Sequence, residues 1–125
     1  MAKKYVDGFV LVIPKKNVGA YRKMATEAGQ VWKRFGALDY KECMGQELAP
    51  DTSGMQMLGF AALTKLKKTE TVWFSYILYK SRAHRDSVNK KVMAYFDKKY
   101  GKGDMKMPFD MRRFSYGGFT VEVDF

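Results

Sequence analysis

The sequence has little cysteine, little histidine and no long hydrophobic run. Its single cysteine, Cys43, cannot form an internal disulfide or supply a thiolate metal cage, so we expect a reducing cytoplasm and no metal site. The longest apolar run, residues 9–13, is far shorter than the roughly 20 residues that cross a bilayer. The first residues, MAKKY, lack a secretory core. We therefore expect an unexported, cytoplasmic protein that is not bound to a membrane.

The composition is that of a folded globular chain. Of the 125 residues, 46% are hydrophobic and 15% are aromatic, which excludes intrinsic disorder and low-complexity architecture. A chain of this length buries roughly two-thirds of its unfolded surface without help from metals or disulfides. Residues 1–125 are therefore expected to form one domain.

Acidic residues are in the minority, and this imbalance raises the question of an anionic partner. There are 23 Lys and Arg residues against 13 Asp and Glu residues, a formal net charge of +10. The positive charges are scattered in pairs along the whole chain, as on ordinary solvated faces, and no nucleic-acid-binding motif accompanies them. Binding of nucleic acid or another anionic partner stays as an alternative.

The first half of the chain reads as strand, helix, strand. Residues 5–13 are rich in β-branched and aromatic side chains, and Pro14 ends them. Asn17 is a candidate helix N-cap, followed by apolar residues at helical spacing up to Gly36. Residues 38–44 alternate, with Leu38, Tyr40 and Glu42 on one side, and predict a second strand.

The second half repeats this order after a long connection. Residues 45–70 carry turn signals and only a short apolar patch, so we expect a loop with a short helix or strand. Residues 71–79 form the strongest predicted strand, which we place centrally. Ser81 is the expected cap of a second helix that Gly101 ends, and residues 103–110 are a polar linker. Residues 114–125 predict a last strand, in which the Gly117–Gly118 pair indicates a bulge or a close backbone approach.

The order β-α-β, loop, β-α-β predicts an α+β, ferredoxin-like fold, with a four-stranded antiparallel sheet and both helices on one face. The other face is also apolar, and an exposed sheet face of this kind needs a cover. Face-to-face pairing of two copies is the simplest cover. We therefore predict a homodimer that forms a dimeric α/β barrel.

Four blocks of the sequence resemble the YbaA-like family of bacterial proteins. They are residues 5–9 (YVDGF), 79–86 (YKSRAHRD), 107–110 (MPFD) and 116–119 (YGGF), with Asn89, Val92 and Met93 also fitting the pattern. The resemblance implies a member of the dimeric α/β barrel superfamily and a domain of unknown function. Relatives in that superfamily include cofactor-free monooxygenases, haem-degrading enzymes and stress-response proteins, so the fold selects no activity.

Two residues are candidate catalytic groups. His84 is the single histidine, in the first turn of the second predicted helix, where it is either a general base or a capping and packing residue. Asp7 lies in the middle of the first strand, where a carboxylate needs a partner. It is either the partner of an arginine or lysine or a site residue.

Five further residues are candidate ligand-binding groups. The amphipathic rings Trp73, Tyr79 and Tyr116 either line a pocket or belong to the core. Arg85 and Arg113 suit a carboxylate or phosphate, although Arg85 also suits pairing with its neighbour on the helix surface. Cys43 is expected to be a small buried hydrophobe.

These residues leave three functions open, and none of them requires a cofactor. The first is binding of a small organic molecule between the sheet and the second helix. The second is cofactor-independent oxygenation of an aromatic substrate, with His84 or Asp7 as the base. The third is the binding of an anionic partner, which rests on the net charge alone.

Overall fold

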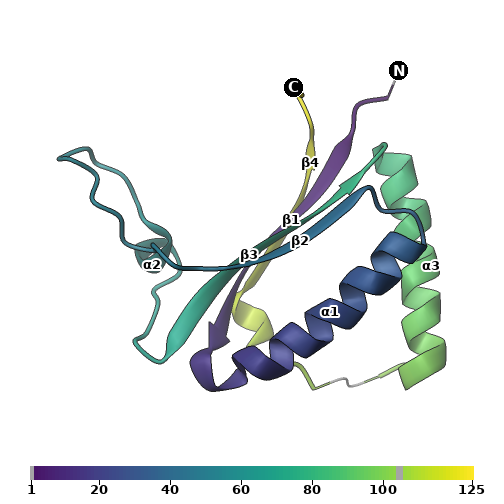
Figure 1. The fold of residues 1–125 in the computed structure, drawn as a ribbon, viewed down its shortest axis with the longest axis horizontal. Coiled ribbons are helices and arrows are strands. Elements are labelled where there is room, and N and C mark those ends of the chain that lie inside the picture. The colour runs from purple at the N-terminus through teal and green to yellow at the C-terminus, as the bar shows by residue number, and fades with distance from the viewer. Residues whose placement is uncertain (1, 104–105) are drawn as a thin grey trace.

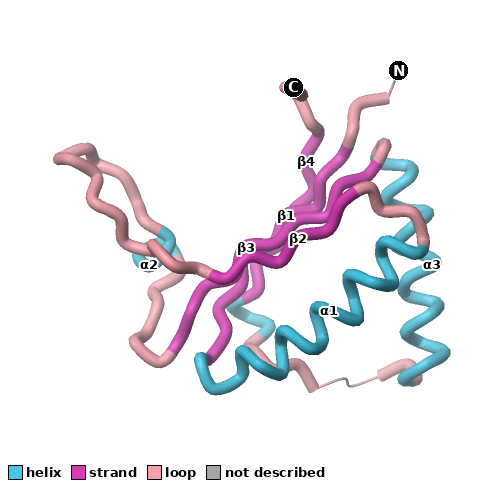
Figure 2. The backbone as a smooth tube through the Cα atoms, in the orientation of Figure 1, coloured by secondary structure: helices cyan, strands magenta, loops and turns pink. Residues whose placement is uncertain are grey.

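The computed structural model describes residues 2–103 and 106–125, in which both long helices cover the same face of a four-stranded antiparallel sheet (Figures 1 and 2). The strand order is β2-β3-β1-β4, so β1 and β3 are central. The strands are β1 (Tyr5–Pro14), β2 (Asp39–Met44), β3 (Glu70–Tyr79) and β4 (Phe114–Thr120). The helices are α1 (Val18–Arg34), α2 (Phe60–Leu63) and α3 (Arg82–Tyr100), with short 3-10 turns η1 (Lys15–Asn17) and η2 (Met111–Arg113). The predicted α+β, ferredoxin-like fold is confirmed.

The register of the strands separates a helix-facing side of the sheet from a bare side. Leu11 of β1 pairs with Trp73 of β3, and both are buried under the helices. Phe74 and Phe119 lie on the bare side, and these residues are 46% and 59% exposed. Because side chains alternate along a strand, one sheet carries a finished core on one side and an uncovered apolar surface on the other.

The helix boundaries follow the expected capping signals, with one difference. The Ser81 hydroxyl accepts the His84 N–H at the start of α3, and Gly101 ends that helix with a positive φ of 84°. Asn17 precedes α1, but its side chain makes no capping bond; its amide donates instead to the Pro108 carbonyl at 2.9 Å. Asn17 therefore ties the start of α1 to the chain before β4.

The connection between β2 and β3 projects from the sheet on the side away from α1 and α3 (Figure 1), and we call residues 45–69 the arm. We expected a short helix or strand in this connection, and the structure has a helix there, α2. Arg113 fixes the base of the arm, because it pairs with Glu70 and donates to the carbonyls of Thr64 and Lys65.

Three details of the sequence interpretation change. The last strand ends at Thr120 rather than at residue 125. Cys43 is exposed rather than buried, because it lies on the edge strand β2 and pairs with Phe74 on the bare side. Of the predicted polar linker 103–110, the structure describes residue 103 and residues 106–110, and residues 104–105 lie outside the described residues.

The close approach expected at the glycine pair is confirmed at Gly118. A Cβ at this position would lie 2.2 Å from the Tyr5 hydroxyl oxygen, so only glycine leaves room for that ring.

Among the described residues, none of the helices combines the length and the apolar character needed to pass through a bilayer.

Candidate functional site

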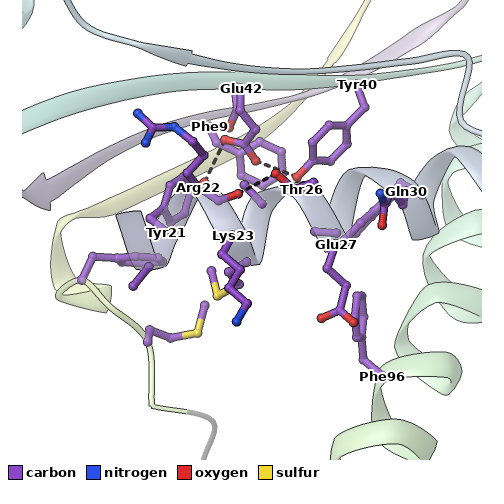
Figure 3. Close-up of a pocket in the computed structure, with 18 of the residues that line it drawn as sticks. Phe9, Tyr21, Arg22, Lys23, Thr26, Glu27, Gln30, Tyr40, Glu42 and Phe96 are labelled. Atoms are coloured by element: carbon purple, nitrogen blue, oxygen red, sulfur yellow. Dashed lines mark hydrogen bonds between the residues drawn. The ribbon is translucent and has the colours of Figure 1, made fainter. Parts of the chain in front are cut away.

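A cavity of about 1190 Å³ lies between the helix-facing side of the sheet, α1 and the C-terminal half of α3 (Figure 3). The chain after α3 contributes Met107 and Phe109 to its wall. The aromatic members of that wall are Phe9, Tyr21, Trp32, Tyr40, Phe96, Tyr100, Phe109 and Phe114. This volume is somewhat larger than the roughly 300–1,000 Å³ of sites that hold drug-sized molecules, and the exposed surface of the lining is mostly apolar, as in such sites.

Glu42 is the acidic centre of the cavity. Its carboxylate accepts the hydroxyl of Tyr21 at 2.8 Å and the hydroxyl of Tyr40 at 2.6 Å. Figure 3 shows the three side chains converging, with Tyr40 and Glu42 coming from β2 and Tyr21 from α1. Tyr40 and Glu42 share a face because they are two residues apart on a strand.

Burial and the adjacent charge keep both phenols protonated. Burial raises the pKa of Tyr21 and of Tyr40 far above the ordinary value of 10, and the negative charge of Glu42 raises each pKa further. Gly29 of α1 allows this packing, because a Cβ there would lie 2.9 Å from the Tyr40 ring.

A row of rings extends along the cavity wall from Tyr40 to Tyr100, which is half exposed. Trp32 lies 6.1 Å from Tyr40 and 6.4 Å from Phe96, measured between ring centroids. Phe96 stacks on Tyr100, whose hydroxyl donates to Glu27 at 2.6 Å, and Glu27 also pairs with Lys99. This wall is therefore aromatic from Tyr40 to Tyr100.

Asp7, Arg85 and Tyr116, three of the predicted site residues, form one cluster outside the cavity lining. The buried Asp7 carboxylate accepts Arg85 at 2.6 Å and the Tyr116 hydroxyl at 3.2 Å, and Arg85 also donates to that hydroxyl at 2.9 Å. Burial raises the pKa of Asp7 above its usual 3.8, and the Arg85 charge opposes this rise. Arg85 also donates to Asp86, so the expected pairing with its neighbour is present. The structure therefore provides the arginine partner expected if Asp7 is one half of an ion pair.

Tyr79 belongs to a second buried network that reaches the cavity through Trp32. The Trp32 indole N–H lies 3.0 Å from both the Tyr79 hydroxyl and the Asn89 side-chain oxygen, and the Tyr79 hydroxyl donates to that oxygen at 3.0 Å. Burial raises the pKa of the Tyr79 phenol, which therefore stays protonated. This network holds Trp32, a cavity residue, at a fixed orientation between α1 and α3.

His84 lies in the first turn of α3 and binds the backbone just before that helix. Its Nδ1 accepts the backbone N–H of Lys80 at 3.0 Å, and its ring lies edge-on to Tyr79. Burial, together with the charges of Lys80 and Lys91, lowers the pKa of the imidazole below 6.5. His84 is therefore neutral at pH 7 and engaged with the backbone.

Trp73 and Arg113 lie apart from the other predicted site residues. Trp73 belongs to the core around Leu11 and also lines a smaller groove of about 530 Å³ between α1 and β2. Its indole N–H is buried and finds no partner in the described part of the chain. Arg113 is directed to the base of the arm rather than to the cavity.

The structure thus gathers Asp7, Arg85, Tyr116, Tyr79 and His84 around the first half of α3, and it builds the cavity from other residues. The cavity groups that sequence reasoning missed are above all Tyr21, Tyr40 and Glu42. A signal existed for two of them, because Glu42 shares with Tyr40 and Leu38 the side of a strand that must face the helices. Nothing in the sequence placed Tyr21 beside them.

No three His, Cys, Asp or Glu side chains within residues 2–103 and 106–125 lie close enough together to hold a metal ion.

Comparison with known proteins places this geometry in a family. The family model described as "Protein of unknown function (DUF1428)" matches residues 4–111. The chain is 40% identical over 121 residues to the "Uncharacterized protein YbaA" of Escherichia coli K12, covering 97% of this chain and 98% of that protein, and equally to YbaA of Shigella flexneri. Among solved structures, a dimeric ferredoxin-like protein from an uncultured marine organism matches with a TM-score of 0.56 and 12% identity, covering 98% of this chain and 99% of that one. This structural likeness supports the ferredoxin-like fold.

Proposed function

Because this chain belongs to the YbaA-like family of proteins of unknown function, DUF1428, we propose its function from its own geometry: it binds a small, largely apolar organic molecule in the cavity between the sheet, α1 and α3. One observation carries the proposal, namely that a domain of 125 residues has an aromatic-lined cavity of about 1190 Å³ that is open to solvent. An open concavity of this kind leaves apolar ring surface in contact with water, and a bound apolar ligand would remove that surface from water.

The polar groups in the cavity support ligand binding more directly than they support turnover. Glu42, Tyr21 and Tyr40 give one end of an apolar space a fixed hydrogen-bonding pattern, as orientation-setting groups do in binding sites. His84 and Asp7, the two bases considered for an oxygenase, lie outside the cavity lining. The proposal is therefore a binding protein, and oxygenation is not part of it.

Filling the cavity tests this function. Ala28 lines the cavity from α1, so Ala28→Trp places a large ring inside it. Ala94 is exposed on α3 and outside the lining, so Ala94→Trp is the matched control. We expect 2-naphthalenemethanol to bind the wild-type protein and Ala94→Trp, measured by saturation-transfer NMR. Ala28→Trp should lose this binding; equal binding by all three proteins would overturn the proposal.

We also propose that the partner is a second copy of this chain, bound through the bare side of the sheet. Phe74 and Phe119 are exposed there, and exposed apolar side chains on an uncovered sheet face favour an interaction surface. The solved structure with the same fold is titled a dimeric ferredoxin-like protein. The arm projects on this same side of the sheet, which adds to the surface available to the partner (Figure 1).

Sedimentation velocity tests the dimer. The wild-type protein should sediment as a dimer of the 14.4 kDa chain. Phe74→Glu places a charge on the bare side and should yield monomers, whereas Met111→Glu, at a similarly exposed residue of η2, should stay dimeric. A monomeric wild-type protein, or a dimeric Phe74→Glu variant, would contradict this interface.

A further inference from the structure

Glu42 is a carboxylate at an aromatic cavity with no cationic partner of its own. Within the described residues it takes part in none of the ion pairs, in contrast to Asp7, Glu27 and Glu70, which each pair with an arginine or a lysine. Its side chain is only partly exposed, and its hydrogen-bond partners are the two phenols. A partly buried charge of this kind costs free energy that an opposite charge would offset.

The hydrogen-bond directions leave acceptors at this end of the cavity. The Tyr21 and Tyr40 protons are directed to Glu42, so the carboxylate and the phenol oxygens present lone pairs. Two other donors of the wall are engaged elsewhere: the Trp32 indole donates to Tyr79 and Asn89, and the Tyr100 hydroxyl donates to Glu27. A ligand group placed here gains most by donating protons.

The rings beside Glu42 favour a donor that is also a cation. Tyr40 contacts Glu42 directly, and Trp32 and then Phe96 continue the aromatic wall away from it. The faces of aromatic rings attract ammonium groups. Arg22 and Lys23 also belong to the lining, but their side chains are exposed on α1 and neither forms an ion pair with Glu42. The chain as a whole carries +10, and Arg22 and Lys33 line the smaller groove that Glu42 shares, but the charge hydrogen-bonded to the cavity phenols is that of Glu42. A ligand that carries a carboxylate is disfavoured most strongly here, because its negative charge would be repelled by that of Glu42.

We propose that the cavity recognises an organic ammonium ion, a protonated amine on an apolar or aromatic body, with Glu42 as its counter-ion. The proposal rests on the binding function proposed above and assigns the chemical class of the ligand. The phenols of Tyr21 and Tyr40 are positioning groups, because they fix the carboxylate that meets the cation.

Three probes that share one ring system test this assignment at pH 7 by calorimetry: 2-naphthylmethylammonium, 2-naphthalenemethanol and 2-naphthoate. We expect the ammonium probe to bind about tenfold more tightly than the alcohol, and the carboxylate more weakly than both, because hydrogen bonds to charged groups are the stronger ones. Glu42→Gln keeps the shape of the side chain and removes its charge. It should abolish the ammonium preference while leaving binding of the alcohol within about threefold. Glu47→Gln, at an exposed glutamate outside the cavity, is the matched control and should bind as the wild type does.

The outcomes separate the two proposals. Binding of the alcohol to Glu42→Gln shows that the variant still folds around its cavity, so its loss of amine preference then reports the charge alone. Equal affinity for the three probes in the wild type, abolished by Ala28→Trp, would overturn the ammonium assignment and keep the binding function. Absence of binding by all three probes would overturn both. An ammonium preference that persists in Glu42→Gln would overturn the role of Glu42.

Discussion

Arg85, in the first turn of α3, donates to the Asp7 carboxylate in the middle of β1 over 2.6 Å, across 78 residues of sequence. Both side chains are largely buried, at 12% and 2% exposure. The Arg85 guanidinium also lies 4.9 Å from the centre of the Tyr5 ring. The pair therefore fastens α3 to the central strand β1, and it forms only when α3 is packed on the sheet.

Breaking this pair should be costly. Asp7→Ala leaves the buried Arg85 charge without its main partner, and we expect a loss of about 3–5 kcal/mol in the free energy of unfolding. Urea denaturation measures the change. Asp86→Ala is the control, because Asp86 pairs with the same arginine but is 65% exposed, and it should cost less than about 1 kcal/mol. If the two variants lose equal stability, the Asp7–Arg85 pair is not the fastening described here.

The close packing of Gly118 against Tyr5 gives a second prediction. In Gly118→Ala the new methyl group overlaps the Tyr5 hydroxyl, and the ring is held under Arg85, so we expect destabilisation of about 1–3 kcal/mol. Gly19→Ala is the matched control: a Cβ there meets nothing within 4 Å, and alanine favours a helix, so stability should rise by about 0.5–1 kcal/mol. Thermal unfolding compares the two. A neutral Gly118→Ala would show that the strand shifts at no cost.

The contacts of Arg113 predict local rather than global protection. Arg113→Met removes the side chain that binds Glu70 and the carbonyls of Thr64 and Lys65, so the amides of residues 63–66 should exchange with solvent about tenfold faster. Hydrogen exchange with mass spectrometry detects this change. Arg112→Met provides the comparison, since the Arg112 side chain is 90% exposed and pairs with Asp110 alone among the described acidic residues. Unchanged exchange in Arg113→Met would show that the arm is held by other contacts.

His84 should titrate below the ordinary range. Burial and the charges of Lys80 and Lys91 lower its pKa below 6.5, and protonation of Nδ1 would break the bond from the Lys80 N–H. Since this is the single histidine, one imidazole resonance in a proton NMR titration gives the value directly. A pKa at or above 6.5 would contradict the structure.

The same shift sets a direction for stability. The unfolded chain takes up the histidine proton at a higher pH than the folded chain does. The contribution of neutral His84 to stability is therefore present above pH 6.5 and is lost as the pH falls through the folded pKa. The melting temperature should fall between pH 7.5 and pH 5.5 in the wild type and fall less in His84→Gln. The pKa of Asp7 is raised above 3.8 in the folded chain, so protonation of Asp7 increases stability as the pH falls, which is opposite to the effect of His84. If the wild-type melting temperature instead rises as the pH is lowered from 7.5 to 5.5, His84 does not dominate the pH dependence of stability.

The alternation of side chains and the capping residues were enough to predict the element order and the fold. In residues 71–79 the apolar side chains alternate between two sides, as they do in a strand that lies between two neighbours. Ser81 and Gly101 mark the start and the end of the helix that follows. Such patterns are local, because they depend on periodicity and on the bonds that a few adjacent backbone groups require. They also identified Asp7 as a residue that needs a partner, since a carboxylate in the middle of a strand is costly in any fold.

The cavity could not be derived in this way. Tyr21 and Glu42 are 21 residues apart and lie on different elements, so whether the tyrosine meets the carboxylate depends on where α1 lies against β2. Arg85 and Asp7 present the same problem, since each had several conceivable partners until α3 was placed on the sheet. The sequence alone determined which segments form strands and helices and which faces are apolar. Only the tertiary structure decided which distant side chains meet, because the angle between packed helices fixes where side chains close the core and where they leave space.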